Sequence, residues 1–217
     1  MVDPIIIVGV PRSRTSLTTA IFHFCGMQIG DVLGANSNNK KGQFENREIV
    51  DKIEKPYLKS FGYDPKGQYP LPDPKKLPID INRKDMVLTI AKKQGIDTSK
   101  IWGFKDTKYI LSFYSWLNAF PKSTWIIVNR KKQDIVKSCE LTPFMNKRKD
   151  WGPFVDEFRQ KFNLLKQEHP AVYDVDSDDI IEFKLDVIQS IVEKIGLQWE
   201  EQRIKDFIDP ALTRLKN

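Results

Sequence analysis

The chain has little cysteine, little histidine and no long apolar run, and each shortage excludes a class of protein. Its 2 cysteines, Cys25 and Cys139, are too few and too far apart for a disulfide framework or a zinc cluster. The 2 histidines, His23 and His169, stand apart from the motifs described below, and no metal site is predicted. No apolar run approaches the ~20 residues that a helix needs to cross a bilayer. We therefore expect no membrane span, and the reduced cytoplasm is the expected location.

The overall composition is that of a folded α/β protein. Apolar residues make up 40% and charged residues 29% of the 217 residues, which excludes a disordered or collagen-like chain. A chain of this length suits one domain over residues 1–217. The net charge of +6 favours anionic ligands, although a solvated basic surface also explains so modest an excess. Nucleic acid is not an expected partner, because the basic cluster at 147–149 accompanies no recognised readout motif.

Residues 5–17 carry the most information, because an apolar strand breaks at Gly9 into a cationic turn that reopens as a helix. Such a turn predicts a phosphate cradle, since backbone N–H groups at a helix start and its positive dipole end attract an anion. The expected donors are the N–H groups of residues 13–16. Arg12 would add a bidentate guanidinium to the same oxygens. A strand–turn–helix joint without a ligand is the alternative for this segment taken alone.

This turn keeps the frame of the ATP-binding loop GxxxxGK[ST] but lacks its lysine. The positions of the second glycine, the lysine and the Ser or Thr hold Arg14, Thr15 and Ser16. The side chain that reaches the β- and γ-phosphates of ATP is therefore absent, and ordinary ATP or GTP hydrolysis is disfavoured.

Strands alternate with helices along the rest of the chain. Apolar periodicity predicts strands at 101–106, 124–130 and 179–184, and helices at 17–24, 83–94, 109–120, 133–140, 153–168 and 186–195. The strands end in polar or charged residues, which predicts a mostly parallel sheet with its ligand at the carboxyl ends of the strands. Pro56 is expected to bend or end a helix that contains Ile49 and Ile53. It begins a proline-rich excursion at about 56–84, either a plain loop or a lid or wall facing the substrate.

With the strand ends in view, the chain resembles sulfotransferases that use 3′-phosphoadenosine 5′-phosphosulfate (PAPS), from Ile5 to about Leu215. The segment GVPRSRTSL at 9–17 is similar to their 5′-phosphosulfate loop, PRSGT[TS]L. The resemblance implies that the donor is held by Pro11, Arg12, Ser13, Arg14, Thr15 and Ser16. Arg14 replaces the usual glycine, so a turn with positive φ would be costly here and a different loop shape is the alternative.

The segment IIVNRKKQDIVKS at 126–138 resembles the part of this family that binds the 3′-phosphate. An arginine and a serine eight positions later contact that phosphate in the family, and Arg130 and Ser138 have this spacing with Asp134 between them. The proline that usually follows the arginine pair is missing. The alternative for this motif taken alone is that Arg130 pairs with an acidic neighbour.

Three further stretches have counterparts in bacterial and phage-type members of the family. NNKKGQFEN at 38–46 is similar to NPKGxFE, and WGFKDTK at 102–108 is similar to GFKDPR. The closing FIDPALTRLK at 207–216 also has a counterpart, which adds Arg214 to the expected nucleotide contacts. The resemblance implies a P-loop-like three-layer α/β/α sandwich with a central, mostly parallel sheet.

The resemblance further implies in-line transfer of a sulfuryl group from PAPS to a hydroxyl or amine of a small-molecule or saccharide acceptor. Arg12 and Lys105 are the expected catalytic cations, and Glu45 is favoured over Asp106 as the base. A structural Glu45, capping a helix that starts near Asn46, is the alternative. A sulfuryl group carries less negative charge than a γ-phosphoryl group, so no metal is required.

Two other functions remain open from the sequence. A P-loop phosphotransferase acting on small substrates would share the fold and the phosphate cradle. A descendant that binds nucleotide without catalysis is the other alternative, and Arg14 is the feature that keeps it open. The acceptor and the oligomeric state are not indicated.

Overall fold

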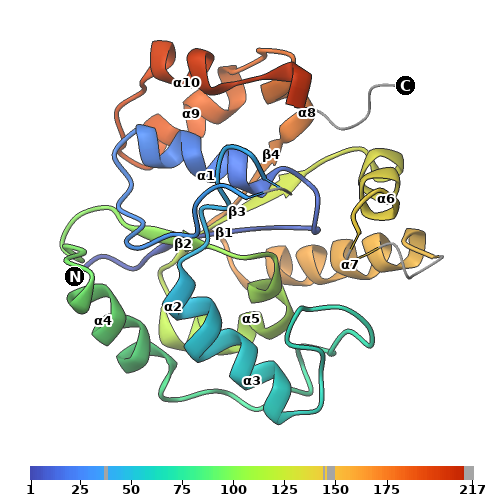
Figure 1. The fold of residues 1–217 in the computed structure, drawn as a ribbon. Coiled ribbons are helices and arrows are strands. Elements are labelled where there is room, and N and C mark those ends of the chain that lie inside the picture. The colour runs from blue at the N-terminus through green and yellow to red at the C-terminus, as the bar shows by residue number, and fades with distance from the viewer. Residues whose placement is uncertain (37–38, 144, 146–149, 213–217) are drawn as a thin grey trace.

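In the computed structural model, which describes residues 1–36, 39–143, 145 and 150–212, a parallel sheet forms the middle layer (Figure 1). Its strand order is β2-β1-β3-β4. The strands are β1 (Ile5–Gly9), β2 (Gly103–Lys105), β3 (Thr124–Asn129) and β4 (Val172–Asp176). All three pairings between neighbouring strands are parallel.

Helices cover both faces of this sheet (Figure 1). On one face lie α1 (Thr15–Phe24), α8 (Ser177–Ile181), α9 (Asp186–Lys194) and α10 (Glu201–Phe207). On the other lie α2 (Arg47–Ile49), α3 (Lys55–Ser60), α4 (Arg83–Lys93), α5 (Phe113–Ala119) and α7 (Gly152–Glu168), with α6 (Lys132–Glu140) against α7. In the described part of the chain, 3₁₀ helices span Thr107–Ser112 and Pro210–Leu212. No described helix is at once long and apolar enough to cross a membrane.

Alternate side chains of the central strands serve two separate cores. Ile5 and Ile7 pack with α1 and α8–α10, whereas Ile6 and Val8 pack with the helices of the opposite layer. A strand buried on both faces reads as a continuous apolar run, which is why β1 and β3 are evident in the sequence. The predicted three-layer α/β/α fold with a parallel sheet is confirmed.

The predicted last strand at 179–184 is wrong. The fourth strand is β4, and the following residues form the helix α8. Only Val175 of β4 is buried, because β4 lies at the edge of the sheet, so its apolar signal is weak. The Asp176 carboxylate accepts a hydrogen bond from the Asp178 N–H at 2.8 Å and caps α8, whose buried Ile180 belongs to a helical face.

The helical run from Arg47 continues through Pro56 to Ser60 instead of ending there. A π-helical turn, Val50–Glu54, joins α2 to α3, and the Lys55 N–H donates to the carbonyl of the residue five positions earlier. Proline lacks an N–H group and clashes with the preceding turn of a regular α-helix. The wider π turn just before it accommodates the ring, and a π turn of this kind leaves no simple periodic signal in a sequence.

A buried ion pair ties this π turn to α4. The Arg83 Nη1 atom lies 3.1 Å from Glu54 Oε2 and 2.9 Å from Ser112 Oγ. The Arg83 guanidinium carbon lies 4.5 Å from the ring centres of Tyr57 and Trp116. Burial raises the pKa of Glu54, and Arg83 opposes this shift. The pair is fully shielded from solvent, so losing one partner leaves the other charge buried and uncompensated.

We predict that Arg83→Ala lowers the free energy of unfolding by about 3–5 kcal/mol, because it strands the Glu54 carboxylate in the core. Urea unfolding followed by tryptophan fluorescence measures the change. Lys92→Ala, at an exposed position of the same helix, is the control and should stay within about 0.5 kcal/mol of the parent. A loss below about 1 kcal/mol in Arg83→Ala would contradict a central structural role for the pair.

Candidate nucleotide-binding site

A cavity of about 800 Å³ opens where the carboxyl ends of β1, β2 and β3 meet. Among the described residues, its walls carry nine lysine and arginine side chains but only two carboxylates, Glu45 and Asp209. Such an excess of cations suits a ligand with several negative charges.

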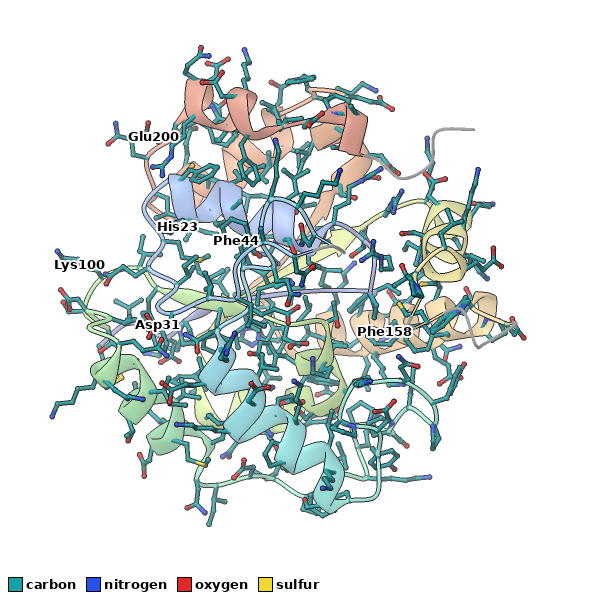
Figure 2. All side chains as sticks on the ribbon, in the orientation of Figure 1. His23, Asp31, Phe44, Lys100, Phe158 and Glu200 are labelled. Carbon is teal, nitrogen blue, oxygen red and sulfur yellow. The ribbon has the colours of Figure 1, made fainter. Side chains whose placement is uncertain are left out.

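His23 lies in the last turn of α1, at the opposite end from the residues of α1 that line the cavity, and its ring contacts the Met27 carbonyl (Figure 2).

The turn after β1 offers one backbone donor fewer than the predicted cradle would use. The Ser13 N–H donates to the Val10 carbonyl at 3.0 Å, and the Ser13 side chain is buried close to Gly9. Its N–H is therefore committed to the turn. The N–H groups of residues 14–16 remain at the start of α1, where no preceding helical turn can accept them. Three backbone donors thus stand at the positive end of the helix dipole.

Arg14 adopts the conformation that the sequence marks as costly. Its φ is 64°, and Arg12 has a φ of 75°, so both lie in the left-handed region that glycine favours. The Arg14 guanidinium forms an ion pair with Asp178 and lies 3.4 Å from Ser177 Oγ. These contacts with α8 offset the strain, and the loop keeps a glycine-like shape without the glycine.

The two predicted phosphate motifs meet in space. Arg12 Nε donates to Ser138 Oγ at 3.1 Å, and Arg130 Nη1 donates to the Arg12 carbonyl at 2.9 Å. The Arg130 side chain is only 4% exposed, and its Nε has no hydrogen-bond partner among the described residues. Its nearest carboxylate oxygen, on Asp178, is 4.0 Å away. A buried donor without an acceptor is uncommon, and it fits a site that takes an oxyanion.

The cations raise one another's electrostatic energy. Burial, followed by the neighbouring Arg14, lowers the pKa of Arg130 to about 10. Arg130 therefore still carries its charge at neutral pH, but in an environment that disfavours that charge. An entering anion would relieve this repulsion.

Glu45 and Lys105 form a second pair at the end of β2. Lys105 Nζ lies 2.7 Å from Glu45 Oε1, 3.0 Å from the Gln43 carbonyl and 3.4 Å from Ser16 Oγ. The Lys105 side chain is buried, whereas Glu45 is 22% exposed and lines the cavity. The helix α2 is capped by Asn46, which accepts a hydrogen bond from its first turn, so the alternative role of Glu45 as that cap is not seen.

Asp106 is occupied elsewhere. It is fully buried, forms an ion pair with Lys108 at 2.6 Å and accepts the Lys108 N–H at 2.8 Å at the start of a 3₁₀ helix. Although burial acts to lower the pKa of Lys108, the carboxylates of Asp106 and Glu45 raise it above its ordinary value. Lys108, not Asp106, lines the cavity.

Several lining residues were not singled out from the sequence. The Asn39 amide donates to Ser16 Oγ at 2.9 Å, and that hydroxyl donates to the Gln43 carbonyl at 2.9 Å. Both partners lie in the stretch NNKKGQFEN, so the motif signal was present without these roles. Lys66 and Gln68, from the proline-rich segment, also line the cavity. Arg214 and the basic cluster at 147–149 lie outside the described residues.

No group of three or more His, Cys, Asp and Glu side chains in the described part of the chain is arranged to hold a metal ion.

Phe44 lines the cavity and lies beside α1 (Figure 2). Its ring packs edge-on against Phe207 of α10, with ring centres 6.1 Å apart. These two rings add apolar surface to the cationic lining of the cavity.

The fold has solved counterparts among bacterial sulfotransferases. The sulfotransferase domain from the curacin biosynthetic pathway aligns over 92% of this chain and 76% of its own, with a TM-score of 0.57 and 13% identity. The sulfotransferase domain of the Synechococcus PCC 7002 olefin synthase covers 100% of this chain and 85% of its own, with a TM-score of 0.55 and 13% identity. Sulfotransferase STF1 from Mycobacterium tuberculosis H37Rv covers 100% of this chain and 74% of its own, with a TM-score of 0.51 and 13% identity.

By sequence, the chain matches neither a protein-family model nor a curated protein. At 13% identity, the structural likeness defines a sulfotransferase-like fold and nothing finer.

We predict that Gly9→Ala disrupts the phosphate loop. A Cβ atom there would lie 2.4 Å from Ser13 Oγ, 2.7 Å from Thr15 Cγ2 and 2.9 Å from the Val128 carbonyl. The expected cost is about 1–3 kcal/mol of unfolding free energy, with loss of anion binding, measured by urea unfolding and by calorimetric titration with adenosine 3′,5′-bisphosphate. Gly34→Ala meets nothing within 4 Å and serves as the control. Parent-like affinity in Gly9→Ala would show that the loop does not form the cradle.

Proposed function

We propose that the chain is a sulfotransferase that moves a sulfuryl group from PAPS to a hydroxyl or amine of an acceptor. The observation that carries the proposal is the contact between the two cationic motifs. Arg12 Nε hydrogen-bonds Ser138 Oγ while the buried Arg130 Nε lacks a partner among the described residues. A nucleotide with phosphates at both its 5′ and 3′ positions fits this paired arrangement, whereas ADP has no group for the second motif.

The residues fit PAPS in two places. Arg12 and the N–H groups of residues 14–16 would hold the 5′-phosphosulfate, where charge grows as the bisphosphate leaves. Fixed donors aimed at developing charge contribute about 3–4 kcal/mol each to a transition state. Arg130 and Ser138 would hold the 3′-phosphate. PAPS itself supplies the activated sulfuryl group.

Glu45 is the base that we propose for the acceptor. It is partly exposed on the cavity wall, and Lys105 fixes its carboxylate at 2.7 Å. Glu45 Oε would take the acceptor proton, and the neighbouring Lys105 ammonium would orient the sulfuryl oxygens. The full burial of Asp106 and its ion pair with Lys108 favour Glu45 over Asp106 in this role.

The acceptor would enter beside Lys66, Gln68 and Thr107, which line the part of the cavity next to Lys108. A small molecule or a saccharide suits these polar walls. Because Thr15 stands where a P-loop NTPase has its lysine, the site lacks the side chain that a phosphotransferase would place on a γ-phosphate.

We expect adenosine 3′,5′-bisphosphate to bind at least about tenfold more tightly than ADP in calorimetric titration, because a charge-assisted contact to the 3′-phosphate contributes that much. Arg130→Ala should abolish this preference while ADP affinity changes little. Lys131→Ala, which removes the adjacent exposed side chain, is the control and should keep the preference. Stabilisation by Mg-ATP but not by the bisphosphate would instead favour the phosphotransferase.

We expect Glu45→Gln to lower the rate of sulfuryl transfer from PAPS by about 10²–10⁴-fold while bisphosphate affinity stays nearly unchanged. Turnover is measured with a panel of hydroxyl and amine acceptors by release of the bisphosphate. Glu48→Gln changes a carboxylate that pairs with Lys52 and Lys93 and does not line the cavity, and it should leave the rate intact. Full activity in Glu45→Gln would move the role of base to Asp106. Nucleotide binding with no transfer to any acceptor would favour a non-catalytic descendant.

A further inference from the structure

Asp178 connects the loops that follow three neighbouring strands. It lies in the first turn of α8, directly after β4. Arg14, from the loop after β1, donates to Asp178 Oδ1, and the Lys131 N–H, after β3, donates to Asp178 Oδ2 at 3.2 Å. The strands β1, β3 and β4 are neighbours in the sheet. The Asp178 side chain therefore links the segments that leave the sheet where these three strands end.

This carboxylate lies close to the cations that the nucleotide would use. Asp178 Oδ1 is 4.0 Å from Arg130 Nε, the buried donor with no hydrogen-bond partner among the described residues. Although burial acts to raise the pKa of Asp178, the contacts with Arg14 and the Lys131 N–H hold that pKa below its ordinary value. Asp178 is therefore a charged group at neutral pH, next to a cavity built for anions.

Arg14 contacts both the cavity and Asp178. It lines the cavity together with Arg130 and Ser138, while its guanidinium pairs with Asp178. A glycine at this position would leave Asp178 without this partner and the cavity without this cation. A phosphate bound at Arg130 would be negatively charged, as is the nearby Asp178 carboxylate. The two negative charges would repel each other.

We infer that Asp178 is an internal counter-ion that competes with the nucleotide, and that Arg14 exchanges Asp178 for the 3′-phosphate when the nucleotide binds. This inference rests on the proposed function. Asp178 then lowers the affinity of the site for any nucleotide with a 3′-phosphate, and Arg14 acts as a specificity-determining residue. A purely structural tether between α8 and the loop would have the opposite effect, because cutting it would loosen the loop and weaken binding.

The test is calorimetric titration of adenosine 3′,5′-bisphosphate and ADP into the parent and into Asp178→Asn. We expect Asp178→Asn to tighten bisphosphate binding by about tenfold and ADP binding by less than about threefold. Asp179→Asn is the matched control. Asp179 lies beside Asp178 in the first turn of α8, so this variant removes the same charge from the same turn and leaves the Arg14–Asp178 pair in place. It should change the affinities for the bisphosphate and for ADP by the same small factor. Weaker or unchanged bisphosphate binding in Asp178→Asn would overturn the inference.

Arg14→Gly supplies a second measurement. Glycine suits a φ of 64°, so the variant should fold, and thermal unfolding checks this. In this background, the tightening caused by Asp178→Asn should shrink, because there is no guanidinium left to release. An undiminished effect would show that Arg14 does not exchange partners. A parent with no preference for the bisphosphate over ADP would refute the proposed function itself, whereas a parent with the preference and an unresponsive Asp178→Asn would refute only this inference.

Discussion

The pairing of β1 with β3 is the constraint on which the rest of the site depends. Their parallel register pairs Gly9, the last residue of β1, with Val128, the residue before the end of β3. The segments that follow the two strands therefore leave the same edge of the sheet side by side. Arg12 can then reach Ser138 although 126 residues separate them in sequence. Shifting either strand by one residue would also turn its buried side chains toward the wrong core. The apolar packing of both layers therefore fixes the distance between the two cationic motifs.

The register of β2 against β1 explains why β2 contributes a lysine. Lys105 pairs with Ile7, two residues before the end of β1. Its backbone therefore lies within the sheet, short of the loop that follows β1. Only a long side chain reaches from there to Glu45 and Ser16 at the cavity. Burial of the stem is compatible with a charged tip because that tip contacts a carboxylate, a carbonyl and a hydroxyl.

The elements that were predicted from the sequence are those with a strong local signal. The strands β1 and β3 are buried on both faces, and Gly9 at the end of β1 together with the cations after it indicates the loop directly. β4 was missed because only one of its five residues is buried. Asp178 gave no signal, since its contacts lie 164 and 47 residues away in sequence, at Arg14 and Lys131. Glu45 and Lys105 were both identified, but their ion pair depends on how the loop at 39–45 folds back over β2.

The Glu45–Lys105 pair poses a chemical problem for the proposed reaction, because the Lys105 ammonium, at 2.7 Å, already occupies the carboxylate oxygen that would take the acceptor proton. The geometry offers a way around it. An ammonium group has three donors, and those of Lys105 already face Glu45, the Gln43 carbonyl and Ser16 Oγ. The Ser16 contact, at 3.4 Å, is the longest of the three and the one that a sulfuryl oxygen would replace most easily. Drawing the ammonium toward that oxygen would lengthen its contact with Glu45 as negative charge develops on the donor, so a carboxylate oxygen would become free to accept the proton that the acceptor loses.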